Sequence, residues 1–408
     1  MSTALNAAYP TPDELPRKEK LPDPLVAFDR SKITTPDEWT AKRKPELKAL
    51  FEHYMYGKYP ETPQPVTAKV LFEDSEALGG KATLKEVELT TGPAGWPKIY
   101  LLIAAPPGGR SPCFVGANFG GNHLLTDHPR VRIPTAWMPS RYPGVVKGRA
   151  TAAKRGAQAD TWPLEEIIRR GYAVATFYCG DVQPDRPDEP EGLRAALATA
   201  DGAGEPSHTA TIMSWAWGIH RAVDHLASEP SIDPQRIAVV GHSRLGKTAL
   251  LAGAFDDRIA LTVANQAGVG GSGPSRHDDP KAESVARINS AFPHWFCDNF
   301  KQFGDDPSRL PFDQHSLVAL CAPRPVLFAA AADDLWANPA GQFTVLKEAT
   351  PVYELLGVEG LEADATPKPD APLIDSRLGY WIRSGKHAMT PADWNAYMDF
   401  ADKWLRKK

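Results

Sequence analysis

The sequence lacks most of the features that would mark a metal, disulfide or membrane protein. Its 408 residues include four cysteines, none in a Cys-x-x-Cys pair, so zinc is not expected and a disulfide framework is unnecessary. No apolar run reaches about 18 residues, so no membrane span is predicted. The net charge of −4 implies no general attraction to nucleic acid or to an anionic membrane. What remains has the composition of an ordinary globular protein.

The N-terminus also lacks a recognisable leader. Residues 1–10, Met-Ser-Thr-Ala-Leu-Asn-Ala-Ala-Tyr-Pro, contain neither a basic segment nor an apolar core. Two interpretations stay open: the protein is cytoplasmic, or a leader has been removed from it.

The pattern of apolar runs predicts the fold class. Three β-rich runs, at Val66–Phe72, Leu84–Leu89 and Ile99–Ala105, predict antiparallel strands at a sheet edge. Beyond Cys113, short apolar runs alternate with helical patterns, which predicts an α/β protein with a mostly parallel, doubly wound sheet. We expect residues 1–60 to form an arm and a helix that pack on one catalytic domain, residues 61–408. The helix begins at the capping residue Thr35 and runs to about Tyr56, with an interruption at Pro45.

The chain is organised around Gly241-His242-Ser243-Arg244-Leu245-Gly246. A buried strand, Ile237–Val240, precedes this segment, and a helical pattern at Thr248–Phe255 follows it. A serine between a buried strand and a helix, flanked by glycines, is the nucleophile-elbow arrangement. Such a serine stands above the sheet beside backbone N–H groups that face a developing oxyanion. The second glycine comes three residues after Ser243, one later than in the usual pattern.

A catalytic serine needs a base and an acid, which follow it in the chain order serine, acid, histidine. The last predicted strand, Leu378–Arg383, leads to His387, which we expect to be the base. The strand at Pro325–Ala332 leads to Asp333 and Asp334, and either aspartate is in place to fix the tautomer of the histidine.

The remaining histidines and two tryptophans have other expected roles. His242 is expected to be a packing residue that points away from the nucleophile, and Trp215 and Trp217 are expected in the core. His220 and His225 are expected at the surface or as satisfied core residues. Three histidines are candidate cleft residues: His123, His277 and His294.

Several motifs together resemble carbohydrate esterase family 15, the glucuronoyl esterases, over about residues 45–405. Gly-His-Ser-Arg-Leu-Gly-Lys at 241–247 is similar to the family's Gly-Cys-Ser-Arg-x-Gly-Lys/Arg elbow. The other matches are Asn118-Phe-Gly-Gly-Asn-His, Tyr178-Cys-Gly-Asp, Trp215-Ala-Trp-Gly, Ile288-Asn-Ser-Ala-Phe-Pro-His-Trp-Phe, Asp334-Leu-Trp-Ala and Gly385-Lys-His. The resemblance implies an α/β-hydrolase fold, a three-layer sandwich with an N-terminal extension here.

The resemblance also implies residue roles. Ser243 is the expected nucleophile, His387 the base, and Arg244 the cation that stabilises the oxyanion. The expected substrate-binding residues are Lys247, Glu283, Trp336 and Gln266. Gln266 stands where many family members have a glutamate as the acid. A glutamine orients an imidazole but does not offset its charge, so by elimination the acid is Asp334, with Asp333 the weaker candidate.

The first hypothesis is therefore a serine esterase that cleaves the ester between glucuronate on xylan and a lignin alcohol. The alternatives are an esterase of other specificity, such as one for acetylated sugars, and a catalytically weak carbohydrate-binding relative. No metal or organic cofactor is expected, and the partner is a glucuronoxylan or other uronate ester, without nucleic acid or membrane. We expect a monomer, and the resemblance implies a secreted or periplasmic location.

Overall fold

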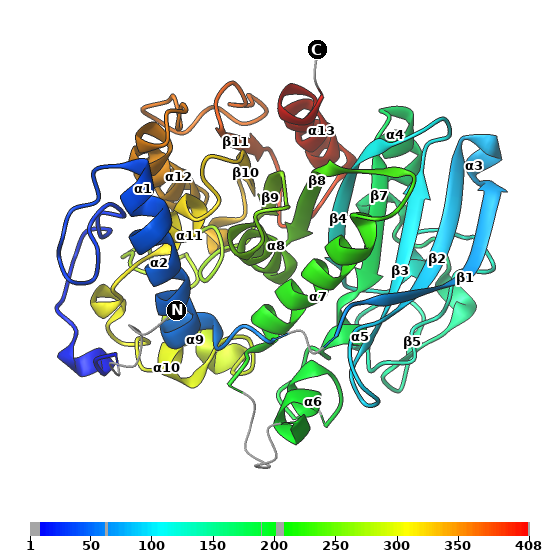
Figure 1. The fold of residues 1–408 in the computed structure, drawn as a ribbon, viewed down its shortest axis with the longest axis horizontal. Helices are drawn as coiled ribbons and strands as arrows, with labels where there is room; N and C mark the ends of the chain where they lie inside the picture. The colour runs from blue at the N-terminus through cyan, green and yellow to red at the C-terminus, as the bar shows by residue number, and fades with distance from the viewer. Residues whose placement is uncertain (1–8, 62–63, 189, 201–207, 407–408) are drawn as a thin grey trace.

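One nine-stranded sheet forms the centre of the protein (Figure 1). The structure is a computed structural model that describes residues 9–61, 64–188, 190–200 and 208–406. The strand order is β1-β2-β3-β7-β4-β8-β9-β10-β11. The bounds are β1 (Thr67–Glu76), β2 (Ala82–Thr90), β3 (Lys98–Ala105), β4 (Ser111–Asn118), β7 (Ala173–Tyr178), β8 (Ile232–His242), β9 (Leu261–Asn265), β10 (Val326–Ala331) and β11 (Leu378–Arg383).

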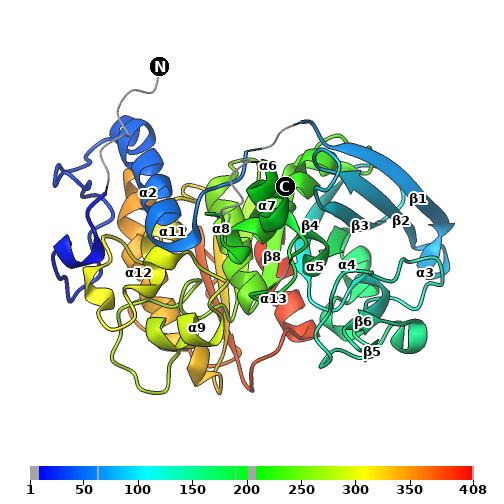
Figure 2. The same cartoon turned by 90° about the horizontal axis from the view of Figure 1, so that it is seen from below.

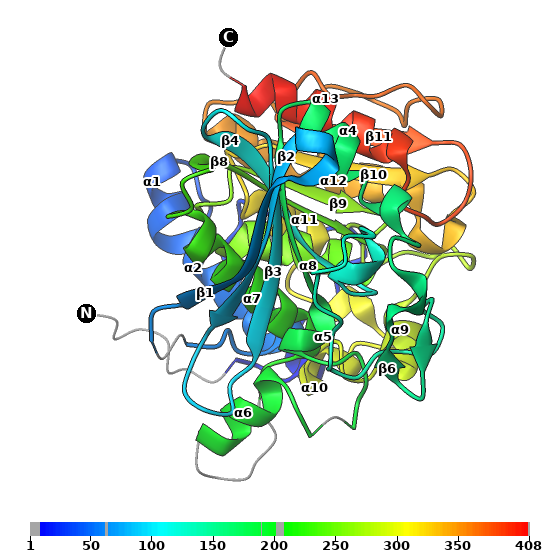
Figure 3. The same ribbon diagram turned by 90° about the vertical axis from the view of Figure 1, so that its right-hand side faces the viewer.

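The sheet has an antiparallel edge and a parallel body. Strands β1, β2, β3 and β7 pair antiparallel in sequence order, and the pairs from β7 to β11 are all parallel. Every residue of β4, β7, β9, β10 and β11 is buried, as expected for parallel strands covered on both faces. Strand β1 is mostly exposed at the edge that faces the viewer in Figure 3. The predicted α/β class and its mostly parallel sheet are confirmed.

Helices cover both faces of the sheet. One apolar core joins α2, α7, α8, α11 and α12 to one face, and a second joins α4 and α13 to the other. The helical bounds are α1 (Pro36–Glu38), α2 (Lys44–Phe51), α3 (Ala77–Gly80), α4 (Leu164–Arg169), α5 (Cys179–Val182), α6 (Leu193–Ala200), α7 (Thr211–Leu226), α8 (Arg244–Phe255), α9 (Val285–Ala291), α10 (Asp298–Lys301), α11 (Gln314–Ala319), α12 (Pro339–Leu355) and α13 (Pro391–Leu405).

The N-terminal helix begins at the predicted cap. Thr35 accepts a hydrogen bond from the Glu38 N–H, and Gly57, at φ 75°, follows the last helical residue, Tyr56. Pro45 does not interrupt the helix. The preceding π-helical turn, Trp39–Arg43, shifts the bonding pattern so that the missing Pro45 N–H falls at the start of α2, where a helix tolerates proline. The helix lies at the opposite end of the molecule from β1 (Figure 2).

The two expected core tryptophans are buried. Trp215 and Trp217 on α7 have no exposed surface. His220 on the same helix is a satisfied core residue, because its Nδ1 lies 2.7 Å from the Tyr59 hydroxyl and its Nε2 lies 2.9 Å from the Ala252 carbonyl. In the described part of the chain, no helix has the length and apolar character needed to cross a bilayer.

The long connection after β4 folds over the carboxyl ends of the strands. Residues 124–160 contain short 3-10 turns and a two-stranded ribbon, β5 (Val145–Val146) with β6 (Arg149–Ala150). The Tyr178 hydroxyl at the end of β7 donates to the Trp137 carbonyl in this segment at 2.7 Å. The segment therefore brings side chains such as Tyr142 toward the end of β8.

Candidate active site

Ser243 stands on a strained turn between β8 and α8. Its backbone has φ 57° and ψ −129°, and it is the residue before the first helical position, Arg244. A Cβ atom at Gly241 would lie 1.9 Å from the Leu245 carbonyl oxygen, so the turn requires glycine there. A Cβ at Gly246 would lie 2.9 Å from the Asn265 oxygen, which explains why the second glycine lies one turn into α8. The turn has the geometry of a nucleophile elbow.

The expected acid and base lie at the same edge of the sheet as Ser243. Strands β8, β9, β10 and β11 are parallel neighbours, so their carboxyl ends meet at one edge. Ser243 follows β8, Asp334 follows β10 and His387 follows β11. Backbone hydrogen bonds from Ala332 to Arg383 and from Asp333 to Gly385 continue the β10–β11 pairing into the loops. This pairing brings Asp334 and His387 together.

Asp334 and His387 form a close pair. His387 Nδ1 lies 2.7 Å from Asp334 Oδ2, and the aspartate side chain is 5% exposed while the imidazole is 41% exposed. Asp333 is exposed and instead uses its backbone N–H to bond to Gly385. With Nδ1–H donated to the carboxylate, Nε2 is left to accept a proton. Among the described residues, the hydrogen bond of the His387 side chain is made to Asp334 and not to Ser243.

The loop that carries His387 is held by Gln266. This residue follows β9 at φ 48°, and its side chain is 2% exposed. Its amide nitrogen donates to the Ala388 carbonyl and its amide oxygen accepts from the Ala388 N–H, both at 2.9 Å. Arg383 adds a further bond to the same carbonyl. Gln266 therefore orients the backbone next to the imidazole rather than the imidazole itself.

His242, expected to be a packing residue, packs against the imidazole of His387. Its ring centroid lies 4.5 Å from that of His387, and its Nδ1 lies 2.8 Å from Asn265 Oδ1. Burial, followed by the charge on His387, lowers the pKa of His242 to about 3. His242 is therefore neutral at neutral pH and places no second cation against the base.

Arg244 is held beside the elbow by an anion and by aromatic rings. Its Nε lies 2.8 Å from Asp185 Oδ2, and its Nη2 donates to the Tyr142 hydroxyl at 3.0 Å. The guanidinium carbon lies 4.4 Å from the centroid of Phe119 and 5.7 Å from that of Trp295. Burial disfavours the charge, but the negative charge of Asp185 and the hydrogen bond to Tyr142 outweigh it and raise the pKa of Arg244. Arg244 is thus a fixed, permanent cation.

Lys247, Glu283 and Trp336 form one connected group. Lys247 Nζ contacts the Ala267 carbonyl at 2.6 Å, the Val269 carbonyl, and Glu283 Oε2 at 3.2 Å. Trp336 Nε1 donates to the other Glu283 oxygen at 3.0 Å. An ammonium has three N–H donors, so these contacts engage all of them. Lys247 and Glu283 are buried, while Trp336 is 36% exposed.

Comparisons with known proteins found similar sequences and structures. Residues 198–357 match the family model for fungal glucuronyl esterase. A prokaryotic protein named carbohydrate esterase MZ0003, of unknown organism, is 42% identical over 393 residues, which are 94% of this chain and 89% of that protein. The chain belongs to carbohydrate esterase family 15. It is a carboxylic ester hydrolase with the α/β-hydrolase fold.

Two solved structures of this esterase family resemble the chain over its whole length. A promiscuous CE15 esterase from the marine bacterial metagenome has a TM-score of 0.88 at 41% identity, covering 96% of this chain and 98% of that one. The glucuronoyl esterase from Solibacter usitatus has a TM-score of 0.87 at 35% identity, covering 97% and 100%. The resemblance inferred from the motifs is therefore confirmed.

For this CE15 esterase, the structure brings together all eight residues singled out from the sequence, although their individual roles stay predictions. It adds three residues that no quoted motif contains, Tyr142, Asp185 and Asn265, and it shows the contacts of Phe119, His294 and Trp295, which lie in quoted motifs. Of the candidate cleft histidines, His294 contacts Asp185, His277 lies 2.8 Å from the Glu283 carbonyl, and His123 is fully buried. His294 and Trp295 belong to a quoted motif, whereas Asp185 had no local signal.

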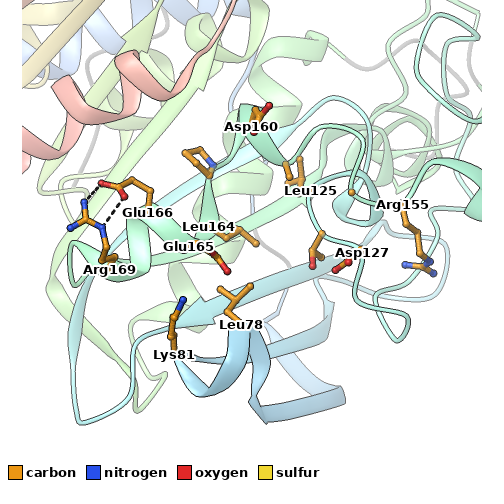
Figure 4. A pocket seen from close by; sticks show the side chains of 14 residues that line it. Leu78, Lys81, Leu125, Asp127, Arg155, Asp160, Leu164, Glu165, Glu166 and Arg169 are labelled. Carbon is orange, nitrogen blue, oxygen red and sulfur yellow. Dashed lines mark hydrogen bonds and ion pairs between the residues drawn. The ribbon is translucent and has the colours of Figure 1, made fainter.

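A separate pocket of about 750 Å³ lies between the β1–β2 turn and α4 (Figure 4). Its walls carry both apolar and charged side chains, among them Leu78, Lys81, Leu125, Asp127, Arg155 and Arg169. None of the residues of the candidate active site lines it. We therefore assign the chemistry to the strand ends around Ser243 and not to this pocket.

Replacing Gln266 by the glutamate of many relatives is expected to harm this protein. In Gln266→Glu the Ala388 N–H keeps an acceptor, but the Ala388 carbonyl then faces a second acceptor in a buried site. We expect the free energy of unfolding to fall by ~1–3 kcal/mol, measured by denaturant titration, with no gain in kcat. The loss should be smaller at about pH 5 than at about pH 8, because protonation returns a donor to the introduced carboxyl. Unchanged stability together with a higher kcat would show that a second acid is useful here.

Proposed function

We propose that this chain is a serine esterase that hydrolyses glucuronate esters through an acyl-enzyme, with Ser243, His387 and Asp334 as its triad. The observation that carries the proposal is the 2.7 Å contact between His387 Nδ1 and Asp334 Oδ2 at the sheet edge that also carries the elbow. The identity of 35% to a glucuronoyl esterase supports the substrate class.

The first half of the reaction forms the acyl-enzyme. Ser243 Oγ bonds to the C6 carbonyl carbon of the uronate while His387 Nε2 accepts the hydroxyl proton, and Asp334 stabilises the resulting imidazolium. The carbonyl oxygen becomes an oxyanion. His387 then gives its proton to the departing alcohol as the C–O bond breaks, which leaves the uronate esterified to Ser243.

The second half releases the acid. A water molecule gives a proton to His387 and bonds to the acyl carbon, a second oxyanion forms, and the proton returns to Ser243 as its bond to carbon breaks. The products are the free glucuronate and the regenerated serine. The two half-reactions together consume one ester and one water molecule, and they require no redox step or further co-reactant.

Arg244 is the expected source of oxyanion stabilisation. Its backbone N–H is the first of α8, and none of the described residues supplies a backbone acceptor for it. Its side chain adds a fixed cation whose Nη1 has no hydrogen-bond partner among the described residues. A preorganised donor and a cation at the elbow strengthen as negative charge develops, which lowers the barrier rather than merely binding substrate.

We infer that the sugar ring lies against Glu283 and Trp336. The Glu283 carboxylate retains acceptor capacity for hydroxyl groups, and the exposed indole of Trp336 offers an apolar face to a pyranose. Lys247 supports this contact by holding Glu283 and the loop at Ala267 and Val269 in place. Because the polymer that carries these esters lies outside cells, we infer that the enzyme acts there.

A broader esterase activity is the second candidate function. One observation favours it: the metagenomic relative at 41% identity is described as promiscuous. A catalytically weak carbohydrate-binding relative is less favoured, because Asp334 already supplies the carboxylate that Gln266 lacks.

The test is a comparison of kcat/KM on methyl or benzyl glucuronate with kcat/KM on a sugar acetate, using Ser243→Ala to measure background hydrolysis. We expect the uronate esters to be preferred, because Glu283 and Trp336 recognise the acyl portion. Equal rates for wild type and Ser243→Ala would rule out the serine mechanism. A preference for the acetate would be consistent with the serine mechanism but would show that the proposed substrate class is wrong.

A further inference from the structure

Arg244 forms an ion pair with one buried carboxylate, that of Asp185. Asp185 follows α5, and its Oδ2 lies 2.8 Å from Arg244 Nε, with both side chains nearly buried at 8% and 12% exposure. The Nε–H does not point at the oxygen well enough for a hydrogen bond, so the contact is an ion pair. Arg141 contributes a weaker contact to the same oxygen at 3.9 Å.

The other oxygen of Asp185 is fixed by two donors. Trp295 Nε1 donates to Oδ1 at 2.7 Å, and His294 Nε2 lies 3.0 Å from the same atom. Burial alone would raise the pKa of Asp185, but His294, Arg244 and Trp295 together hold that pKa below its usual value. The carboxylate is therefore ionised, and Trp295 and His294 set its orientation.

We propose that Asp185 is a positioning residue for catalysis, which acts by holding the Arg244 guanidinium in the orientation that stabilises the oxyanion. This inference rests on the proposed ester hydrolysis and names a part of the site that the motifs did not indicate. Asp185 itself touches neither the substrate nor the reacting atoms.

Two physical arguments support the proposal. A free arginine side chain samples many rotamers, so a donor that must be in place before the oxyanion forms needs partners in the resting enzyme. The ion pair at Nε and the Tyr142 bond at Nη2 fix two corners of the guanidinium plane and leave Nη1 for the oxyanion. Asp185 also offsets the charge of Arg244, so the arginine acts as a directed donor more than as a bare positive charge.

A double-mutant cycle tests this coupling. We expect Asp185→Asn to lower kcat by about tenfold or more, up to the 10²–10³-fold cost of losing an oxyanion donor, with KM changed by less than about threefold. In an Arg244→Ala background the same substitution should change kcat by less than about twofold, because the residue through which it acts is gone. The fold-change in kcat that Asp185→Asn causes is measured in the wild-type and in the Arg244→Ala background. Methyl glucuronate and p-nitrophenyl acetate are both used, since the hydrolysis of either ester forms an oxyanion.

The outcomes are unambiguous. The proposal is supported if Asp185→Asn lowers kcat by a factor at least about five times larger in the wild-type background than in the Arg244→Ala background. Any smaller ratio of these two fold-changes overturns it. If wild type hydrolyses only the acetate, the proposed substrate is wrong, yet the cycle still decides the role of Asp185. Should Asp185→Asn not fold, Asp185→Glu, which keeps the charge and displaces it by one methylene, is measured in the same cycle.

The chain offers a matched control in Asp256→Asn. Asp256 is as buried as Asp185, at 9% exposure, and also pairs with an arginine, Arg258. It follows the C-terminal end of α8, about 18 Å along the helix from Ser243. We expect this variant to lower the melting temperature while its kcat stays within about twofold of wild type, which separates loss of a buried carboxylate paired with an arginine from loss of oxyanion stabilisation.

Discussion

Asp334→Asn is expected to lower kcat by about 10⁴-fold, or ~5 kcal/mol in barrier height. The amide keeps the size of the carboxylate but favours the wrong imidazole tautomer and leaves the imidazolium uncompensated. Among the described residues no second carboxylate pairs with His387, and Gln266, which bonds to the adjacent Ala388, carries an amide. Steady-state kinetics on methyl glucuronate measure the loss. Retention of more than about a tenth of wild-type kcat would contradict the assignment.

Asp333→Asn is the matched control for this experiment. Asp333 is adjacent in sequence, but it is exposed, and its contact with the base loop is made by its backbone N–H, which asparagine retains. We expect its kcat to stay within about threefold of wild type. The sequence left both aspartates open as the acid. The structure distinguishes them because the turn after β10 directs only the second side chain to His387.

The elbow could be predicted because its constraints are local. Three local signals are adjacent in the sequence: a β-branched run, a glycine, and a helix-forming segment. The glycine is required because any Cβ there would lie 1.9 Å from a backbone oxygen. The boundaries were less accurate. Helix α8 starts at Arg244 rather than Thr248, because tertiary packing outweighs local helix preference at its first residues.

The partners of the site residues could not be predicted, because they come from distant segments. Asp185, Tyr142 and His294 reach Arg244 or its anion from three different loops, and no spacing in the sequence relates these loops. Gln266 illustrates the same limit. From the sequence, a glutamine at this position indicated only that an acid is missing. In the structure, the amide donates one hydrogen bond to the Ala388 backbone and accepts another from it. A carboxylate could not make both bonds, because it has no donor for the Ala388 carbonyl.

Arg244→Ala is expected to lower kcat by about 10²–10³-fold, or ~2.7–4 kcal/mol, with little change in KM. The guanidinium gains strength as the carbonyl oxygen becomes negative, so its loss raises the transition state more than the bound ester. Arg244→Lys should recover little of this loss. A lysine lacks the planar fork that reaches Asp185 and Tyr142 together with the oxyanion. Both variants are compared with wild type by kcat and KM on methyl glucuronate. An increase in KM at unchanged kcat would mean that Arg244 binds the ground state and transition state equally, and the oxyanion would then depend on backbone N–H groups alone.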